Sequence, residues 1–201
     1  MRGNYAKASR LLRPLAEQGN TDAQVRLTLI AGAAYKKGDY ATAVRLVRPL
    51  AEQGNVHAQA RLAFLYANGE GFPQDYAAAV DWYRKAAEQG SAIAQYNLAD
   101  MYRVGEGVPA DNAVAASWYR KAAEQGYTQA QSNLGVMYDN GDGVPQDDVA
   151  AHMWFNLAAS SGFGEAVKNR DMVARHMTPA QLAEAQTLAR QWKATPTLAP
   201  P

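Results

Sequence analysis

Few residues in this chain of 201 could do chemistry, and the three histidines are the first to consider. His57, His152 and His176 are candidates for metal binding, but none has a second histidine four residues away, the spacing that puts two ligands on one helix face. The chain has no cysteine, which excludes disulfides and thiolate zinc sites. We therefore expect no bound metal, and we interpret the histidines as packing or solvated side chains.

A catalytic site would need a nucleophile with a base at a characteristic spacing, and the sequence shows neither. It lacks the Ser-x-x-Lys element of penicillin-binding and β-lactamase-like enzymes. Glutamates recur at Glu52, Glu88 and Glu124, but one in every 36 residues is too regular for a unique acid–base pair. We expect no catalytic residue, no cofactor and no enzymatic activity; a β-lactamase-like or other enzyme is the alternative.

Three Gly-x-Gly pairs, which begin at Gly69, Gly105 and Gly141, have the composition of a phosphate-binding loop. Such a loop needs a preceding strand and a following helix whose N-terminal amides face the phosphate. Here each pair follows a helical pattern and precedes a proline. The sequence therefore favours turns between helices over nucleotide sites.

Three tryptophans, Trp82, Trp118 and Trp154, could offer a stacking surface for bases or sugars. They occupy the same repeat position as Leu11 and Leu46, however, and that position lies on the apolar face of a predicted helix. We predict that the tryptophans pack in the core.

The composition excludes several partners in general terms. A net charge of +1 gives no electrostatic footprint for nucleic acid or a membrane surface. The longest apolar run, Leu27–Ala34, is far too short to span a membrane. We expect a monomer that binds neither nucleic acid nor membrane.

The start of the chain leaves its compartment open. No signal peptide precedes the patterned sequence as written, which would indicate a cytoplasmic protein. Residues Gly3–Gly19 nevertheless look like the second half of a repeat. The alternative is a longer, exported protein, periplasmic for example, of which this array is a regulatory or targeting module.

A glycine recurs at positions 19, 54, 90, 126 and 162, and these five glycines divide the chain into periods of 35 or 36 residues. Four of them follow Ala-Glu-Gln, and glycine suits the left-handed position just past a helix C-terminus. Before each glycine, apolar residues recur at i, i+3, i+4, i+7 and i+8, which predicts one helix. After it, an alanine, a leucine and in three repeats a tyrosine (Ala94, Leu98 and Tyr102, for example) predict another. Each period is thus a predicted helical hairpin.

The segments between the two helices have the sequence Gly-x-Gly-(Phe/Val)-Pro-x-Asp, in which the aspartate can cap the next helix. The first full repeat uses the shorter turn Lys37-Gly38-Asp39. Pro14 and Pro49 lie within second helices, where we expect a kink rather than a break because the apolar pattern continues beyond them.

After Gly162 the pattern continues with changes typical of a terminal cap. Arg170 stands in the leucine position and Ala174 in the tyrosine position. Thr178-Pro179-Ala180-Gln181 has the spacing of a capping box and predicts a last helix.

The period of 36 residues, with Ala-Gln-x-x-Leu-(small)-x-x-Tyr, Gly-x-Gly-Val-Pro-Gln-Asp and Ala-x-x-Trp-Tyr-Arg-Lys-Ala-Ala-Glu-Gln-Gly, resembles the Sel-one-like repeat (SLR) family of the tetratricopeptide-repeat superfamily. The resemblance covers roughly residues 3–162. It implies an all-α fold, a right-handed α-solenoid of antiparallel hairpins with about eleven helices. It also implies an adaptor or scaffold, commonly bacterial, that binds a protein or peptide and has no catalytic residues.

We expect a single array over 3–193. It begins with a half repeat, 3–19, and continues with four repeats, 19–54, 54–90, 90–126 and 126–162. Capping helices follow over 163–193, and a disordered proline-rich tail over 194–201.

The binding surface is predicted by exclusion. On the first helix of each hairpin, the face opposite the Ala-Leu-Tyr stripe has no packing partner, and in tetratricopeptide-type superhelices that face lines the concave groove. Residues there vary between repeats and include apolar side chains without a structural role, a mixture suited to a peptide or partner helix. An ordinary solvated face is the alternative. The predicted partner-binding residues are His57, Phe64, Asn68, Ile93, Tyr96, Asp100, Arg103, Gln129, Ser132, Val136, Asp139 and Asn140.

Overall fold

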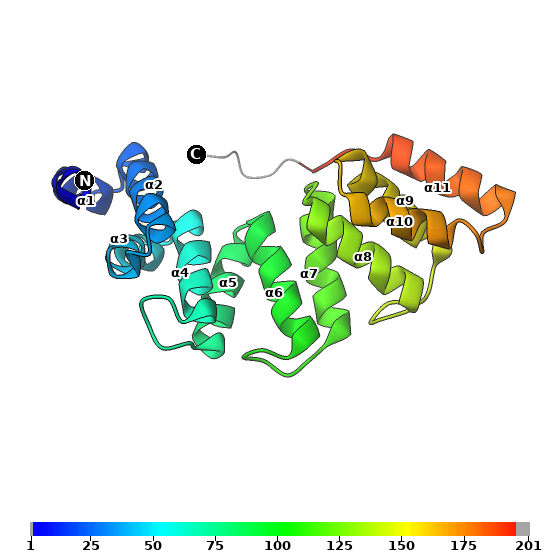
Figure 1. Ribbon diagram of the computed structural model, residues 1–201, viewed down its shortest axis with the longest axis horizontal. Coiled ribbons are helices and arrows are strands. Elements are labelled where there is room, and N and C mark those ends of the chain that lie inside the picture. Colours follow the sequence, from blue (N-terminus) through cyan, green and yellow to red (C-terminus); the bar gives the residue numbers. More distant parts are fainter. Residues whose placement is uncertain (1, 196–201) are drawn as a thin grey trace. The chain divides into compact units, whose positions relative to one another are not determined.

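The computed structural model describes residues 2–195, and within that range every regular element is an α-helix (Figure 1). Two compact units are formed, one by residues up to Ser91 and one from Ala92 onward. The eleven helices of the described range are α1 (Arg2–Glu17), α2 (Thr21–Lys36), α3 (Tyr40–Glu52), α4 (Val56–Asn68) and α5 (Tyr76–Glu88) in the first unit, and α6 (Ala92–Val104), α7 (Asn112–Glu124), α8 (Thr128–Asn140), α9 (Asp148–Ser160), α10 (Gly164–Val173) and α11 (Pro179–Gln191) in the second.

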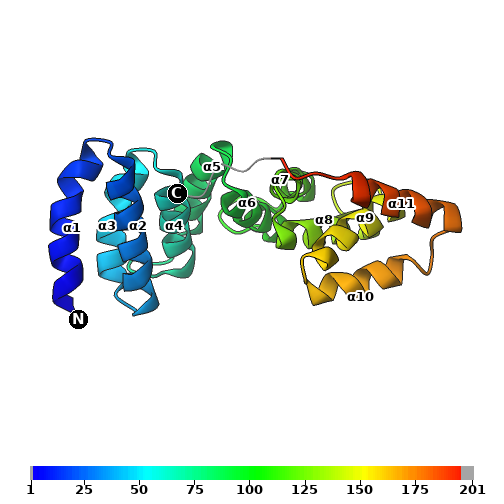
Figure 2. The ribbon, with the colours of Figure 1, turned by 90° about the horizontal axis from the view of Figure 1, so that it is seen from above.

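From α1 to α5 and from α6 to α10, consecutive helices pack against one another, as α1 to α4 do in Figure 2. The core of the first unit contains the predicted stripe residues, among them Leu27, Leu46 and Leu62. In the second unit α10 and α11 both pack on α9. The all-α hairpin architecture expected from the sequence is confirmed.

The predicted helix ends are confirmed in detail. Asp75, Asp111 and Asp147 each accept a hydrogen bond from the backbone N–H three residues on, at 2.9–3.0 Å. Thr178 and Gln181 form the predicted capping box at the start of α11. The helices α1 and α3 run through Pro14 and Pro49 without a break.

Two glycines of the fourth repeat allow close packing. A Cβ at Gly135 in α8 would come within 2.7 Å of the Phe155 ring, so glycine lets that ring lie on the helix backbone. Gly143, at φ +70°, lies against the backbone of Asn112 at the start of α7, where a side chain would clash. The second glycine of the turn thus serves packing, as the turn interpretation requires.

A set of glutamine hydrogen bonds joins successive repeats. Gln59 Nε2 donates to the carbonyl of Ala51 at 3.2 Å, and Gln131 Nε2 donates to that of Ala123 at 3.1 Å. Both carbonyls belong to the last turn of a second helix, where they also accept the backbone N–H of the helix-ending glycine, from Gly54 to Ala51 at 3.0 Å and from Gly126 to Ala123 at 2.9 Å. The glutamine five residues after the helix-ending glycine therefore caps the preceding helix.

A second glutamine, the one before the next helix-ending glycine, extends this set. Gln89 Nε2 donates to Gln59 Oε1 at 2.7 Å, and Gln125 Nε2 donates to Gln95 Oε1 at 2.7 Å. In the fourth repeat Ser161 takes that position. Gln131 Oε1 is consequently buried without a hydrogen-bond partner among the described residues.

Three sequence expectations about packing need correction or completion. Leu11 is 66% exposed, because no described helix covers that side of α1. Trp154 is buried, but Trp82 and Trp118 are only half-buried, and Lys85 and Lys121 lie 4.0 Å above their rings. Their packing is therefore partial, and each ring also has a lysine ammonium group over its face.

The tail predicted for 194–201 lies outside the described residues from 196 onward. Its first part is fixed to the second unit, since Thr195 donates to the carbonyl of Glu124 from both its backbone N–H and its hydroxyl, at 2.8 and 3.0 Å.

The missing glutamine gives the first testable prediction. Ser161→Gln places an amide donor beside the unpartnered Gln131 Oε1, and we expect the free energy of unfolding of the second unit to rise by about 1 kcal/mol. Chemical denaturation of purified protein measures this change.

Two controls make the prediction specific. Ser160→Gln adds the same side chain one position away and should give no gain. In a Gln131→Met background Ser161→Gln should also give none, so that a double-mutant cycle isolates the pair. An equal gain in that background would show that the hydrogen bond is not the cause.

Candidate functional site

The three predicted binding residues of the first unit lie on α4, and two of them interact within the unit. The Phe64 ring contacts the Tyr35 ring edge-on at 5.7 Å, and the Tyr35 hydroxyl donates to Glu70 Oε1 at 3.1 Å. Asn68 Nδ2 donates to the Phe64 carbonyl at 2.9 Å, while His57 is exposed. Phe64 therefore has a packing role, contrary to the expectation that it had none.

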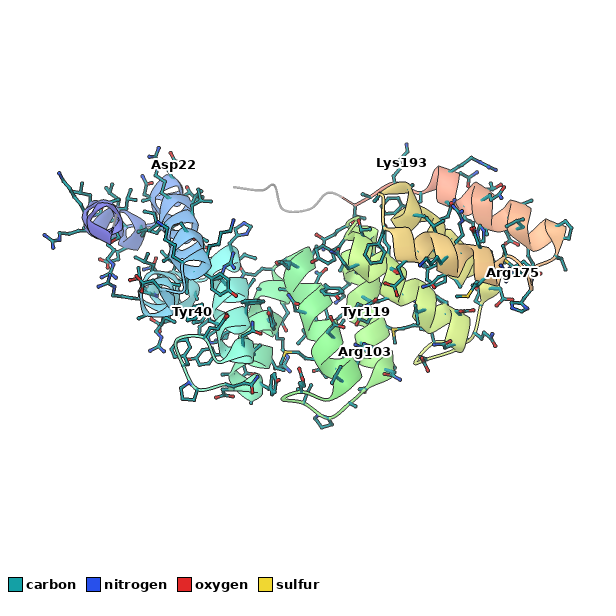
Figure 3. All side chains as sticks on the ribbon, viewed as in Figure 1. Asp22, Tyr40, Arg103, Tyr119, Arg175 and Lys193 are labelled. Carbon is teal, nitrogen blue, oxygen red and sulfur yellow. The ribbon has the colours of Figure 1, made fainter. Side chains whose placement is uncertain are left out.

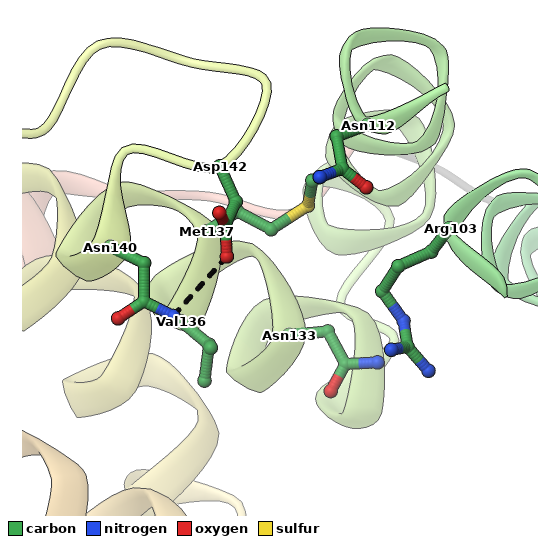
Figure 4. A pocket seen from close by; sticks show the side chains of 7 residues that line it. All are labelled: Arg103, Asn112, Asn133, Val136, Met137, Asn140 and Asp142. Carbon is green, nitrogen blue, oxygen red and sulfur yellow. Dashed lines mark hydrogen bonds between the residues drawn. The ribbon is translucent and has the colours of Figure 1, made fainter. Parts of the chain in front are cut away.

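The second unit contains a groove between α6 and α8 with a volume of about 500 Å³ (Figure 4). One wall is Arg103 of α6, and the other is the exposed side of α8. Asn112 at the start of α7 and Asp142 of the turn after α8 also line it. The α8 lining residues are Asn133, Val136, Met137 and Asn140.

Of the nine predicted residues in this unit, the groove brings together three: Arg103, Val136 and Asn140. Val136 is 37% exposed, an apolar side chain left open between polar neighbours. Asn140 Nδ2 donates to Asp142 Oδ2 at 3.2 Å (Figure 4). This is the part of the predicted surface that forms a concave lining.

A hydrogen-bonded network fixes the α6 wall. The buried Tyr119 hydroxyl donates to Asp100 Oδ1. Arg103 Nε donates to the Tyr119 oxygen at 3.3 Å, and Arg103 Nη2 lies 3.4 Å from Asp100 Oδ1. Figure 3 labels Arg103 and Tyr119 on their neighbouring helices. Asp100 therefore positions Arg103 rather than facing a partner directly.

A cluster of tyrosine rings continues this wall. The Tyr96 ring lies 5.8 Å from that of Tyr119 and 5.1 Å from that of Tyr127. Burial, together with the Asp100 carboxylate, raises the pKa of Tyr96 to about 12. Burial and the hydrogen bond to Asp100 also raise the pKa of Tyr119. Tyr96 is thus part of the packing, which corrects the prediction that it was free of structural duty.

At one position of α8 the open face differs from the one predicted. Ser132, six residues after Gly126, is 4% exposed and faces the core. Asn133, the next residue, lines the groove instead. The sequence signal was present, because the corresponding residues of the other repeats, Arg26, Arg61 and Asn97, are all polar.

The remaining predicted residues do not line the groove. Ile93 and Gln129 are exposed. Asp139 is partly buried, and that burial, with the nearby charge of Asp148, raises its carboxyl pKa. Sequence reasoning missed Asn112, Met137 and Asp142 because they belong to a helix start, a core column and a turn.

The described part of the chain shows neither a cluster of metal-ligating side chains nor a membrane-spanning helix. Among residues 2–195 no three His, Asp or Glu side chains lie close enough to hold a metal ion. Within the same range no helix combines the length and apolar character needed to cross a membrane.

Comparison with known proteins relates the repeats to a family. A family model described as the Sel1 repeat matches residues 56–91, 92–127 and 128–163. No curated protein matches.

Two solved structures are similar over much of the chain. One is a protective antigen present in uropathogenic Escherichia coli strains and displaying an SLR fold: the identity is 33% and the TM-score 0.59, over 92% of this chain and 48% of that one. The other is a Sel1 repeat protein from Oxalobacter formigenes, with 40% identity and a TM-score of 0.58 over 62% of this chain and 94% of that one. The chain therefore spans about half the length of the antigen.

The network predicts a specific cost for losing one hydroxyl. Tyr119→Phe removes the donor to Asp100 and leaves a partly buried carboxylate under-satisfied, so the free energy of unfolding should fall by about 1–3 kcal/mol. Tyr127→Phe removes a hydroxyl from the same ring cluster but keeps the Asp100 bond, and it serves as the matched control. Equal losses in the two variants, measured by urea denaturation, would contradict the network.

The tyrosine pKa shifts predict a loss of stability at high pH. The folded state holds the Tyr96 and Tyr119 protons more tightly than the unfolded chain, whose tyrosines titrate near 10. The free energy of unfolding is therefore undiminished below pH 10 and should decline as the pH rises from 10 toward 12. Denaturation curves recorded across this range give the free energy of unfolding at each pH. Its decline with pH should be smaller in the Tyr96→Phe/Tyr119→Phe variant than in the wild type, and an equal decline would refute the assignment.

Proposed function

Because the chain belongs to the Sel1 repeat family, whose members generally mediate protein–protein interactions, we propose that it binds an extended segment of a partner protein in the groove between α6 and α8. The family is typically non-enzymatic, which agrees with a binding role. The observation that carries the proposal is the groove itself. Its α8 side presents an exposed valine between two asparagines, and none of the three belongs to the stacking stripe.

The lining chemistry suits a peptide backbone. Asn112, Asn133 and Asn140 each carry a carboxamide, which can donate to a carbonyl and accept from an N–H. In Figure 4 the Asn133 side chain points toward that of Arg103 across the groove. Val136 and Met137 supply apolar surface between these polar groups. This combination supports an occupant with alternating polar and apolar contacts, such as an extended chain.

The charge of the groove argues against nucleic acid. Arg103 and Asp142 are the charged lining residues and carry opposite charges. A phosphate backbone would need several cations along the groove. Arg103 is held by Asp100 and Tyr119, so it is pre-oriented to take an acidic side chain or a carbonyl of the segment.

A matched pair of valines tests the proposal. Peptides selected from a displayed random library on the purified protein supply the ligand, and fluorescence anisotropy gives their dissociation constants. Val136→Arg should weaken binding at least tenfold, because a charged side chain fills the apolar part of the groove. Asn133→Ala should weaken it less.

The control is Val167→Arg on α10, a valine of almost the same exposure as Val136, 36% against 37%, that lies outside the groove. It should leave affinity unchanged. Equal affinity of the Val136→Arg and Val167→Arg variants, or failure to select any saturably binding peptide, would overturn the groove assignment.

A further inference from the structure

A second pocket, of about 390 Å³, lies in the second unit where α10 and α11 pack on α9. It shares no residue with the groove. The lining residues that matter are His152 and Asn156 of α9, Arg170 of α10 with Ala174 directly after it, and Gln186 and Arg190 of α11.

The pocket exists because two large side chains of the repeat are truncated here. Position twelve after the helix-ending glycine is a tyrosine in three repeats but Ala174 in this one. The residue six positions before the helix-ending glycine is an arginine in the other repeats, but before Gly162 it is Asn156. In other repeats the two groups meet, as where Arg120 Nη2 donates to the Tyr138 hydroxyl. Removal of both leaves a hollow where that contact would be.

The hollow is lined by charge instead. Arg170 stands where the other repeats have a buried leucine such as Leu134. Its Nη1 donates to Asn156 Oδ1 at 3.4 Å, while Nε and Nη2 donate to Asp171 Oδ1 at 3.0 and 2.8 Å. From α11, Arg190 adds a second guanidinium, which donates to the Thr187 hydroxyl at 3.0 Å.

His152 adds a buried, unsatisfied group. It is 3% exposed and stands where two neighbouring repeats have Val80 and Ala116. Its Nδ1 has no hydrogen-bond partner among the described residues. Burial, with the nearby Arg170 charge, lowers the pKa of His152, so the ring is neutral near pH 7. Burying a polar ring in place of an aliphatic side chain lowers the stability of the fold unless the ring makes a compensating contact.

We propose that this pocket binds a carboxylate group, either of a small organic acid or at the C-terminus of a peptide chain. The two arginines and Asp171 give the lining a net charge of +1, which matches one carboxylate. Arg190 retains donors for a bidentate contact with it. The Gln186 carboxamide is a further neutral donor on the same helix.

An ordinary polar cap would not produce this arrangement. A terminal repeat carries its polar groups on the outer face, in water. Here His152 is buried, Arg170 is only partly exposed, and α11 lies over α9 beside them. His152 and Arg170 therefore line an open pocket between the helices, together with the exposed Gln186 and Arg190 of α11.

The test is an NMR titration at constant ionic strength, followed through the His152 ring and Arg190 Nε resonances. The probes are sodium acetate and an N-acetylated trialanine with a free C-terminal carboxylate; the same peptide as its carboxamide is the chemical control. We expect saturable shifts with a carboxylate probe and none with the carboxamide. Response to acetate identifies a small acid as sufficient, whereas response to the peptide alone identifies a chain end.

Variants separate the pocket from general anion effects. Arg190→Gln, at an exposed side chain, should weaken carboxylate binding at least tenfold. Asn156→Arg/Ala174→Tyr restores the residues of the other repeats, fills the pocket and should abolish binding. Arg175→Gln, an exposed arginine that does not line the pocket (Figure 3), should bind like the wild type. Linear, non-saturating shifts in the wild type, or equal shifts in Arg190→Gln and Arg175→Gln, would overturn the proposal.

Discussion

The hydrogen bond from a glutamine side chain to the last turn of the preceding helix is the interaction on which the stacking of repeats depends. The carbonyl of Ala123 lies in the last turn of α7, inside the core, and accepts the Gly126 backbone N–H at 2.9 Å. Gln131 Nε2 gives this carbonyl a second hydrogen bond from the next repeat, and Gln59 Nε2 does the same for Ala51. Because the glutamine side chain has a limited length, this bond limits the distance between one hairpin and the next. It explains why Ala-Glu-Gln-Gly and Ala-Gln recur together, which apolar periodicity alone does not.

This constraint also decides where recognition can be located. Stacking uses the alanine, glutamine, leucine and tyrosine positions of each first helix, so only the outward positions can vary without loss of stability. In the second unit these are occupied by Asn133, Val136 and Asn140, and the groove is formed there. Its α6 wall is held by a buried tyrosine hydroxyl and a carboxylate, which reduces the entropy that Arg103 would lose on binding. The groove thus has a rigid wall on α6 and, on α8, a wall of residues that the stacking does not constrain.

The helices, their aspartate caps, the turns and the capping box could all be predicted from the sequence, because each depends on residues close together in the chain. The site could be predicted only in part. Ser132 and Asn133 differ by one helical step, and which of them is buried depends on the neighbouring helix, not on their own pattern. Likewise Tyr119 follows the core pattern, while the partner of its hydroxyl, Asp100, is 19 residues away on another helix. Contacts of this kind require the packed structure.

The fourth repeat and the capping segment after it show how departures from a repeat can be interpreted physically. Ser161 in place of glutamine simply leaves Gln131 Oε1 unpartnered, as expected where stacking constraints relax. The other four departures differ, because they come from two helices and surround a single pocket. Relaxation alone would scatter polar residues over solvated surface, but it would not bury an imidazole beside two guanidinium groups and remove the ring that fills the same space elsewhere. The concentration of these changes in one place therefore argues for a bound group rather than for a merely degenerate cap. The four residues concerned are His152, Asn156, Arg170 and Ala174.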